Sequence, residues 1–278
     1  MWHPSTILDQ PVVLRVMFYP RRSWPGISLL ASVHDGRVEV EPGVSVGYSL
    51  HLAQPQSPLI LYFHGNGEIA RDYDSIAPLY TDLGISLLVA DYRGYGWSDG
   101  LPTASSLIHD APLLFEALGQ MLRPEKRASP DAAVEGLKEA ESEIPQRVFV
   151  MGRSLGSAAA IEVARHHQEA IAGLIIESGF AHTLRLLARL GVMLENLDEA
   201  QDVFANLAKI GQIRLPTLVI HGRADMLIPA SEGVALYEGS AAPDDEKRLV
   251  VIPGAGHNDL LTVGAATYFE AIRGFVLG

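Results

Sequence analysis

The sequence predicts an α/β fold, in which a mainly parallel sheet carries helices on both of its faces. Short continuous apolar runs, as at 59–63 and 86–90, are typical of strands that are covered on both sides. Between such runs, apolar residues recur at steps of three and four, as over 68–83, which is typical of helices. The alternation continues over roughly 200 residues, so we predict one domain spanning residues 1–278.

The individual elements follow in order along the chain. We predict strands at 44–52, 59–63, 86–90, 148–151, 172–176, 217–220 and 248–252. We predict helices at 68–83, at 104–122 with a kink at Pro112, and at 155–167, 182–210 and 258–277. Prolines at positions 4, 11, 20 and 25 predict an irregular segment over 1–25. The charged, proline-containing stretch 123–146 predicts a surface excursion with a short helix at 131–143.

The composition of the chain argues against several classes of partner and site. The chain has 21 basic and 33 acidic residues, a formal net charge of −12, whereas proteins that bind nucleic acid or anionic membranes need a basic surface. We therefore expect no nucleic-acid partner. The sequence has no run of 18 apolar residues and no basic, signal-like start, which predicts a cytoplasmic protein without a transmembrane segment. The absence of cysteine excludes disulfides, thiolate metal sites and a cysteine nucleophile.

A Gly-x-Ser-x-Gly motif occupies residues 152–156, directly between a predicted strand and a predicted helix. In that context a tight turn presents the Ser154 hydroxyl above the sheet, at the N-terminus of the helix. The flanking glycines lack side chains that would collide with the neighbouring strand and helix. The alternative interpretation is that Ser154 only caps the helix between two turn glycines.

A serine hydroxyl is a poor nucleophile unless a base activates it and an acid orients that base. Asp225 and His257 each lie a few residues past the end of a predicted strand, in loops that contain glycine. Because the carboxyl ends of parallel strands meet at one edge of a sheet, we expect both residues near Ser154. Glu177 ends another predicted strand and is the alternative acid.

The loop His64-Gly65-Asn66-Gly67 follows the predicted strand 59–63. Acyl transfer develops a negative charge on oxygen, which requires two N–H donors aimed at that position. We expect the donors to be the backbone N–H groups of Asn66 and of Leu155, the residue after the candidate nucleophile. We interpret His64 as a packing residue beneath the loop.

These segments together resemble the α/β-hydrolase superfamily, in the branch of serine hydrolases with a His-Gly-Asn oxyanion loop and a small cap. The resemblance covers residues 44–278 and rests on residues 64–67, 91–98, 152–156, 221–229 and 256–257. It implies Ser154 as nucleophile, Asp225 as acid and His257 as base. It also implies carboxylesterase-like activity on a small acyl substrate. Because acyl transfer needs no further group, we expect no cofactor and no metal.

Residues 180–211 lie between two predicted strands, where this fold inserts its cap. Leucines lie on more than one helical face of this segment. A helix that is apolar on several faces packs against other apolar groups, either of the protein or of a bound ligand. We expect cap helices that wall an acyl pocket. Short to medium acyl esters are therefore the substrates we expect, and thioesters and small amides stay open. The sequence does not give the oligomeric state.

Two alternative functions stay open. Residues 65–70 match the G-x-G-x-x-A pattern of a dinucleotide-binding loop, and Asp91 ends the next strand, where an acid that binds ribose would lie. This Rossmann-type alternative leaves Ser154, Asp225 and His257 without a role. The second alternative is a hydrolase-like scaffold that binds a ligand without reacting.

Overall fold

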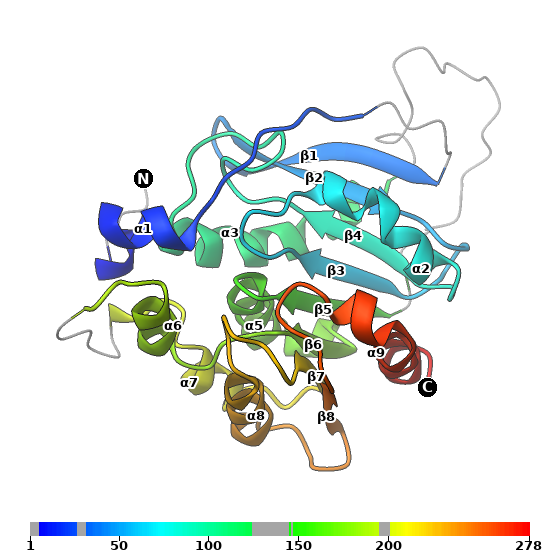
Figure 1. The fold of residues 1–278 in the computed structure, drawn as a ribbon. Coiled ribbons are helices and arrows are strands. Elements are labelled where there is room, and N and C mark those ends of the chain that lie inside the picture. The colour runs from blue at the N-terminus through cyan, green and yellow to red at the C-terminus, as the bar shows by residue number, and fades with distance from the viewer. Residues whose placement is uncertain (1–5, 27–31, 124–144, 146, 195–200) are drawn as a thin grey trace.

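The computed structural model describes residues 6–26, 32–123, 145, 147–194 and 201–278 (Figure 1). Within them, eight strands form one sheet in the order β1-β2-β4-β3-β5-β6-β7-β8. The strands are β1 (Val33–Glu41), β2 (Val44–His51), β3 (Leu59–Phe63), β4 (Ser86–Ala90), β5 (Val148–Arg153), β6 (Gly173–Glu177), β7 (Thr217–Gly222) and β8 (Lys247–Ile252). The pairs β1–β2 and β2–β4 are antiparallel and the other pairs are parallel, which confirms the predicted mainly parallel sheet.

Helices cover both faces of the sheet (Figure 1). The α-helices are α1 (Pro11–Met17), α2 (Ala77–Thr81), α3 (Ala104–Glu116), α4 (Leu118–Met121), α5 (Gly156–His166), α6 (Thr183–Arg189), α7 (Asn206–Ile210), α8 (Ala230–Gly239) and α9 (Leu260–Val276). Side chains of α1 and of α3 to α8 contribute to one apolar core, and those of α2 and α9 contribute to the other. Successive residues of β3 alternate between these cores: Leu59, Leu61 and Phe63 enter the first, and Ile60 and Tyr62 the second.

All seven predicted strands are present, and the structure adds the edge strand β1, which the sequence reasoning did not identify. The expectation of an irregular N-terminal segment is wrong over α1. Pro11 begins this helix at its first position, where a missing N–H costs nothing, and Val13 and Met17 are buried. Helix α8 was also not predicted.

Three predicted helices are broken in the structure. The segment 68–83 forms a 3-10 helix (Ala70–Ser75) followed by α2. The segment 182–210 is not one helix either, because α6 ends before Gly191, whose φ of 84° is left-handed, and the next described α-helix is α7. The segment 104–122 divides at Ala117 into α3 and α4, and Pro112 lies inside α3. The predicted excursion 123–146, with its helix at 131–143, lies almost entirely outside the described residues.

Candidate active site

The turn between β5 and α5 holds Ser154 in a strained backbone conformation with a φ of 52°. Its N–H donates to the backbone oxygen of Glu177 at the end of β6 (2.8 Å). A Cβ on Gly152 would lie 2.2 Å from the Gly156 oxygen, and a Cβ on Gly156 would lie 2.1 Å from the Phe63 oxygen. Only glycine therefore fits at either position, and the turn presents Ser154 at the N-terminus of α5, as the motif predicts.

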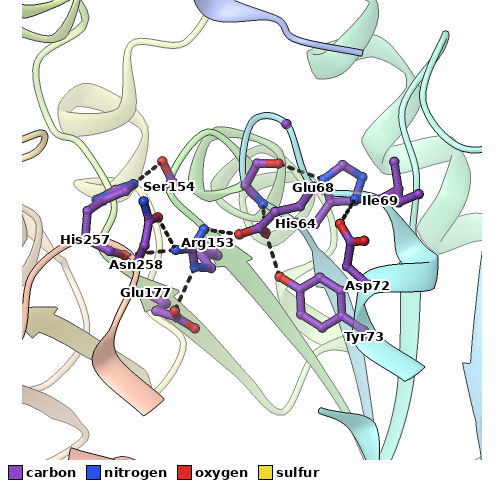
Figure 2. Close-up of polar contacts among 12 residues, drawn as sticks. His64, Glu68, Ile69, Asp72, Tyr73, Arg153, Ser154, Glu177, His257 and Asn258 are labelled. Atoms are coloured by element: carbon purple, nitrogen blue, oxygen red, sulfur yellow. Dashed lines mark hydrogen bonds and ion pairs between the residues drawn. The ribbon is translucent and has the colours of Figure 1, made fainter. Parts of the chain in front are cut away.

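The structure brings His257 and Asp225 to this serine. His257 Nε2 lies 2.9 Å from Ser154 Oγ, and His257 Nδ1 lies 2.7 Å from Asp225 Oδ2 (Figure 2 shows the contact of His257 with Ser154). These contacts join the turn after β5 to the loops after β7 and β8. The order of the three side chains is that of an acid, a base and a nucleophile.

Asp225 is fixed by its own loop. Its Oδ1 accepts hydrogen bonds from the backbone N–H groups of Leu227 (2.9 Å) and Ile228 (2.8 Å), which leaves Oδ2 for His257. Burial acts to raise the pKa of Asp225, but contacts with the imidazoles of His221 and His257 outweigh it and hold the pKa below its ordinary value. The carboxylate is therefore charged at neutral pH.

Glu177, the alternative acid, has a different set of partners. Its Oε1 accepts from Arg153 Nε (3.0 Å), and its Oε2 accepts from the hydroxyl of Tyr268 (2.7 Å). Figure 2 shows its carboxylate pointing away from the His257 ring. The acid that meets the imidazole in this structure is Asp225.

The loop after β3 is tied down by its side chains. The Oδ1 of Asn66 accepts from the backbone N–H of Tyr19 (2.7 Å) and from the hydroxyl of Tyr95 (2.8 Å). The N–H of Gly65 donates to Glu68 Oε2 (2.7 Å). Leu155, which carries the second predicted donor, is buried in the turn after Ser154. Within the described residues, the backbone N–H groups of Asn66 and Leu155 donate to no other protein group.

His64 lies beneath this loop, fully buried. Its Nδ1 donates to the Gly65 oxygen (2.8 Å), and its Nε2 lies 3.2 Å from Asp91 Oδ1. Asp91 is also fully buried, and its Oδ1 accepts from the N–H of Ala70 (2.9 Å). This carboxylate faces the protein interior and not a ribose, so the geometry does not favour the dinucleotide-binding alternative.

A cavity of about 310 Å³ lies between α6 and the segment that follows Asp225. Its apolar wall includes Phe180, Leu186, Leu227 and Ile228, and the exposed residue Ala188 lies at its edge. Two of its wall residues, Leu227 and Ile228, come two and three positions after Asp225. The cavity therefore lies beside the loop whose Asp225 carboxylate contacts His257.

Two charged residues that contact the loops of this site were not predicted from the sequence. Arg153, inside the Gly-x-Ser-x-Gly motif, ends a buried strand, and Glu68 lies three residues after Gly65. A charged side chain at the end of an otherwise apolar strand is the signal that could have identified Arg153. Nothing in the sequence pairs it with Glu68, since the two are 85 positions apart.

In the part of the chain that the structure describes, no group of three or more histidine, aspartate and glutamate side chains has an arrangement that suits a metal ion. None of the described helices combines the length and the apolar character needed to cross a bilayer.

The sequence matches the serine aminopeptidase S33 family over residues 54–189 and the prolyl oligopeptidase family over residues 131–271. It is 30% identical to an uncharacterized protein of Mycobacterium tuberculosis, over 90% of this chain and 81% of that one. It is also 30% identical to the alpha/beta hydrolase domain-containing protein 17B of Homo sapiens, over 78% of this chain and 65% of the relative.

Solved structures share the fold at low sequence identity. An esterase of Pyrococcus furiosus, Pf2001, has a TM-score of 0.68 and 19% identity, covering 93% of this chain and 98% of that one. Est1E of Butyrivibrio proteoclasticus, solved with ferulic acid bound, has a TM-score of 0.63 and 19% identity, covering 87% and 98%. At such identities the likeness concerns the fold alone.

Proposed function

The chain belongs to the α/β-hydrolase superfamily, and on that premise we propose that it is a serine hydrolase that cleaves carboxylic esters through an acyl-enzyme on Ser154. The observation that carries the proposal is the continuous line of hydrogen-bond contacts from Asp225 through His257 to Ser154. Thioesters and small amides of the same acyl group would react by the same route. We further propose a cytoplasmic location.

The proposed reaction has two steps, acylation of Ser154 and hydrolysis of the acyl-enzyme, and the same protein groups act in both. Ser154 Oγ attacks the ester carbonyl carbon while His257 Nε2 takes the hydroxyl proton, and Asp225 stabilises the resulting imidazolium. The backbone N–H groups of Asn66 and Leu155 would hold the oxyanion. Collapse of this intermediate breaks the ester C–O bond, and the alcohol leaves with the proton from His257. Water then attacks the acyl-enzyme in the same way and releases the acid.

The cavity beside α6 supports an acyl substrate, because its wall is mostly apolar. We predict that Ala188→Trp, which would fill this cavity from its edge, shifts the preferred ester toward shorter acyl chains. The longest accepted ester should lose roughly tenfold or more in kcat/KM, in line with the effect of crowding an apolar pocket by a few methylenes. A chain-length series of nitrophenyl esters measures this.

The matched control is Leu184→Trp. Leu184 lies on the same helix and is exposed, but it does not line the cavity. The dependence of kcat/KM on acyl chain length in the Leu184→Trp variant should follow that of the wild type. Equal profiles for all three proteins would mean that the acyl group binds elsewhere.

We also predict that hydrolysis does not depend on a metal ion or a nucleotide. Nucleophile, base, acid and both oxyanion donors of the proposed reaction are groups of this chain. Exhaustive dialysis against a chelator should leave kcat within twofold of its starting value, with buffer-dialysed protein as the control. Activity that disappears on dialysis and returns with a divalent ion would contradict the proposal.

A fluorophosphonate probe tests the proposed function directly. It should modify the wild-type chain at a single serine, Ser154, because the reagent traps only activated serine hydroxyls. A scaffold that binds without reacting would stay unlabelled. A dinucleotide-binding protein would also stay unlabelled, but NAD or NADP would raise its melting temperature.

A further inference from the structure

A buried arginine, Arg153, connects the serine turn with the loop that carries the base (Figure 2). Its Nη2 donates to the backbone oxygen of His257 at 2.8 Å and to Asn258 Oδ1 at 2.9 Å. Its Nε donates to Glu177 Oε1 at 3.0 Å, directly opposite in the β5–β6 register. The side chain therefore holds the loop after β8 against the ends of β5 and β6.

The same guanidinium also reaches the loop after β3. Arg153 Nη1 forms an ion pair with Glu68 Oε1. The other oxygen of Glu68 accepts from the backbone N–H of Gly65 (2.7 Å) and from the hydroxyl of Tyr73 (2.8 Å). Gly65 directly precedes Asn66, whose N–H is one of the proposed oxyanion donors. Glu68 is thus a link between Arg153 and the oxyanion loop.

The pair of Arg153 and Glu177 at the centre of this network is largely removed from solvent. The side chain of Arg153 is 11% exposed and that of Glu177 is 6% exposed. Burial acts to lower the pKa of Arg153, but the carboxylates of Glu68 and Glu177 outweigh it and hold the pKa above its ordinary value, so the side chain is charged. Buried ion pairs add little net stability compared with apolar packing of the same volume. The main consequence of this network is therefore geometric.

We propose that Arg153 is a positioning residue that sets the distances of the base loop and of the oxyanion loop from Ser154. The inference rests on the proposed function, since these distances matter only if Ser154 reacts. Oxyanion donors act at about 2.7–3.1 Å, and a displacement of about 1 Å costs roughly a hundredfold in rate. A single guanidinium group that is linked to both loops would keep the base and the oxyanion donors within this distance range of the reacting atoms.

The planar fork of arginine is essential to this role. It sends hydrogen bonds in separate directions to Glu177, Glu68 and the backbone of His257. Lysine carries the same charge on a single flexible ammonium group and lacks this fixed geometry. The proposal thus separates the effect of the charge, which Arg153→Lys keeps, from the effect of the fork, which it loses.

The test measures the rate constant of fluorophosphonate labelling, kcat, KM and the melting temperature for Arg153→Met and Arg153→Lys. The labelling constant and kcat should both fall roughly 10- to 100-fold in either variant, with KM within about twofold, because binding is kept while geometry is lost. Lysine should recover part of the melting temperature that methionine loses, but not the rate.

Arg93→Met is the matched control. Arg93 is buried to a similar degree and bridges Asp110 on α3 and Glu41 on β1, away from the loops that carry the candidate triad. The Arg93→Met variant should have a lower melting temperature than wild type, as Arg153→Met should. The rate constant of fluorophosphonate labelling of the folded variant should stay within about twofold of the wild-type value.

Glu68→Gln provides an independent variant if Arg153→Met does not fold. It should lower kcat and the labelling constant about tenfold in the wild-type background. In the Arg153→Lys background it should add less than about threefold, because the link is already broken.

The outcomes separate the two proposals. A wild-type chain that no fluorophosphonate labels would overturn the proposed function and this inference with it. Wild-type rates in Arg153→Met or in Glu68→Gln, or full recovery of kcat in Arg153→Lys, would overturn the positioning role alone.

Discussion

Replacing Ser154 with alanine is expected to abolish both ester turnover and fluorophosphonate labelling. The substitution removes the oxygen that we propose forms the acyl-enzyme, while His257 and Asp225 stay in place. Loss of the nucleophile in serine proteases costs roughly 10⁶ in kcat, because the groups of a triad act as one unit. Residual turnover should therefore fall below the detection limit of a nitrophenyl ester assay. Intact-protein mass spectrometry after labelling provides the second measurement.

Ser178→Ala is the matched control for this experiment. Ser178 is also buried, and its φ of 47° lies in the same left-handed region as that of Ser154. In the described structure its Oγ has no hydrogen-bond partner, so its removal should cost little. Both variants therefore carry the same change in the same backbone conformation. Labelling that survives Ser154→Ala and disappears in Ser178→Ala would assign the nucleophile to Ser178.

Local signals explain which parts of the fold could be predicted. Strands β3 and β4 are buried on both faces and read as continuous apolar runs, so their bounds follow from the sequence. Strand β1 is half-exposed and carries charged residues, because it lies at the edge of the sheet and pairs with only one neighbour. Its sequence, VHDGRVEVE, therefore resembles a loop.

The candidate site likewise combines a local feature, which the sequence reveals, with long-range contacts, which it does not. The serine turn is a local feature, and its glycines are required by backbone contacts within a few residues or with the adjacent strand. The contacts of Arg153 with Glu177, Glu68 and His257 span 24, 85 and 104 positions. Only the strand order brings these residues together, and no periodicity in the sequence encodes that order.

The choice of the acid is a further case in which the sequence leaves two candidates. Asp225 follows β7 and Glu177 ends β6, and both of these parallel strands lie on the same side of β5. The loop of Asp225 is long enough to bend over the sheet, and its N–H groups at 227 and 228 fix the carboxylate toward His257. Glu177 ends its strand and faces Arg153 in the register. Loop length therefore decides which carboxylate meets the imidazole.

Asp225→Asn is accordingly expected to lower kcat by roughly 10⁴ with little change in KM, whereas Glu177→Gln should cost about tenfold or less. The asparagine keeps the shape of the side chain but favours the wrong tautomer of His257, and it cannot stabilise the imidazolium. Glu177→Gln only weakens one of the contacts of Arg153. The two substitutions make the same chemical change, carboxylate to amide, so each is the control for the other.

Steady-state kinetics on both variants, with melting temperatures to verify that each is folded, measures this difference. Active-site titration with a fluorophosphonate gives the concentration of competent enzyme, which keeps partial unfolding out of kcat. A folded Glu177→Gln that loses more activity than a folded Asp225→Asn would place the acid after β6. Because Asp225 Oδ2 lies 2.7 Å from His257 Nδ1 while Glu177 is bonded to Arg153 and Tyr268, we expect the larger loss at Asp225.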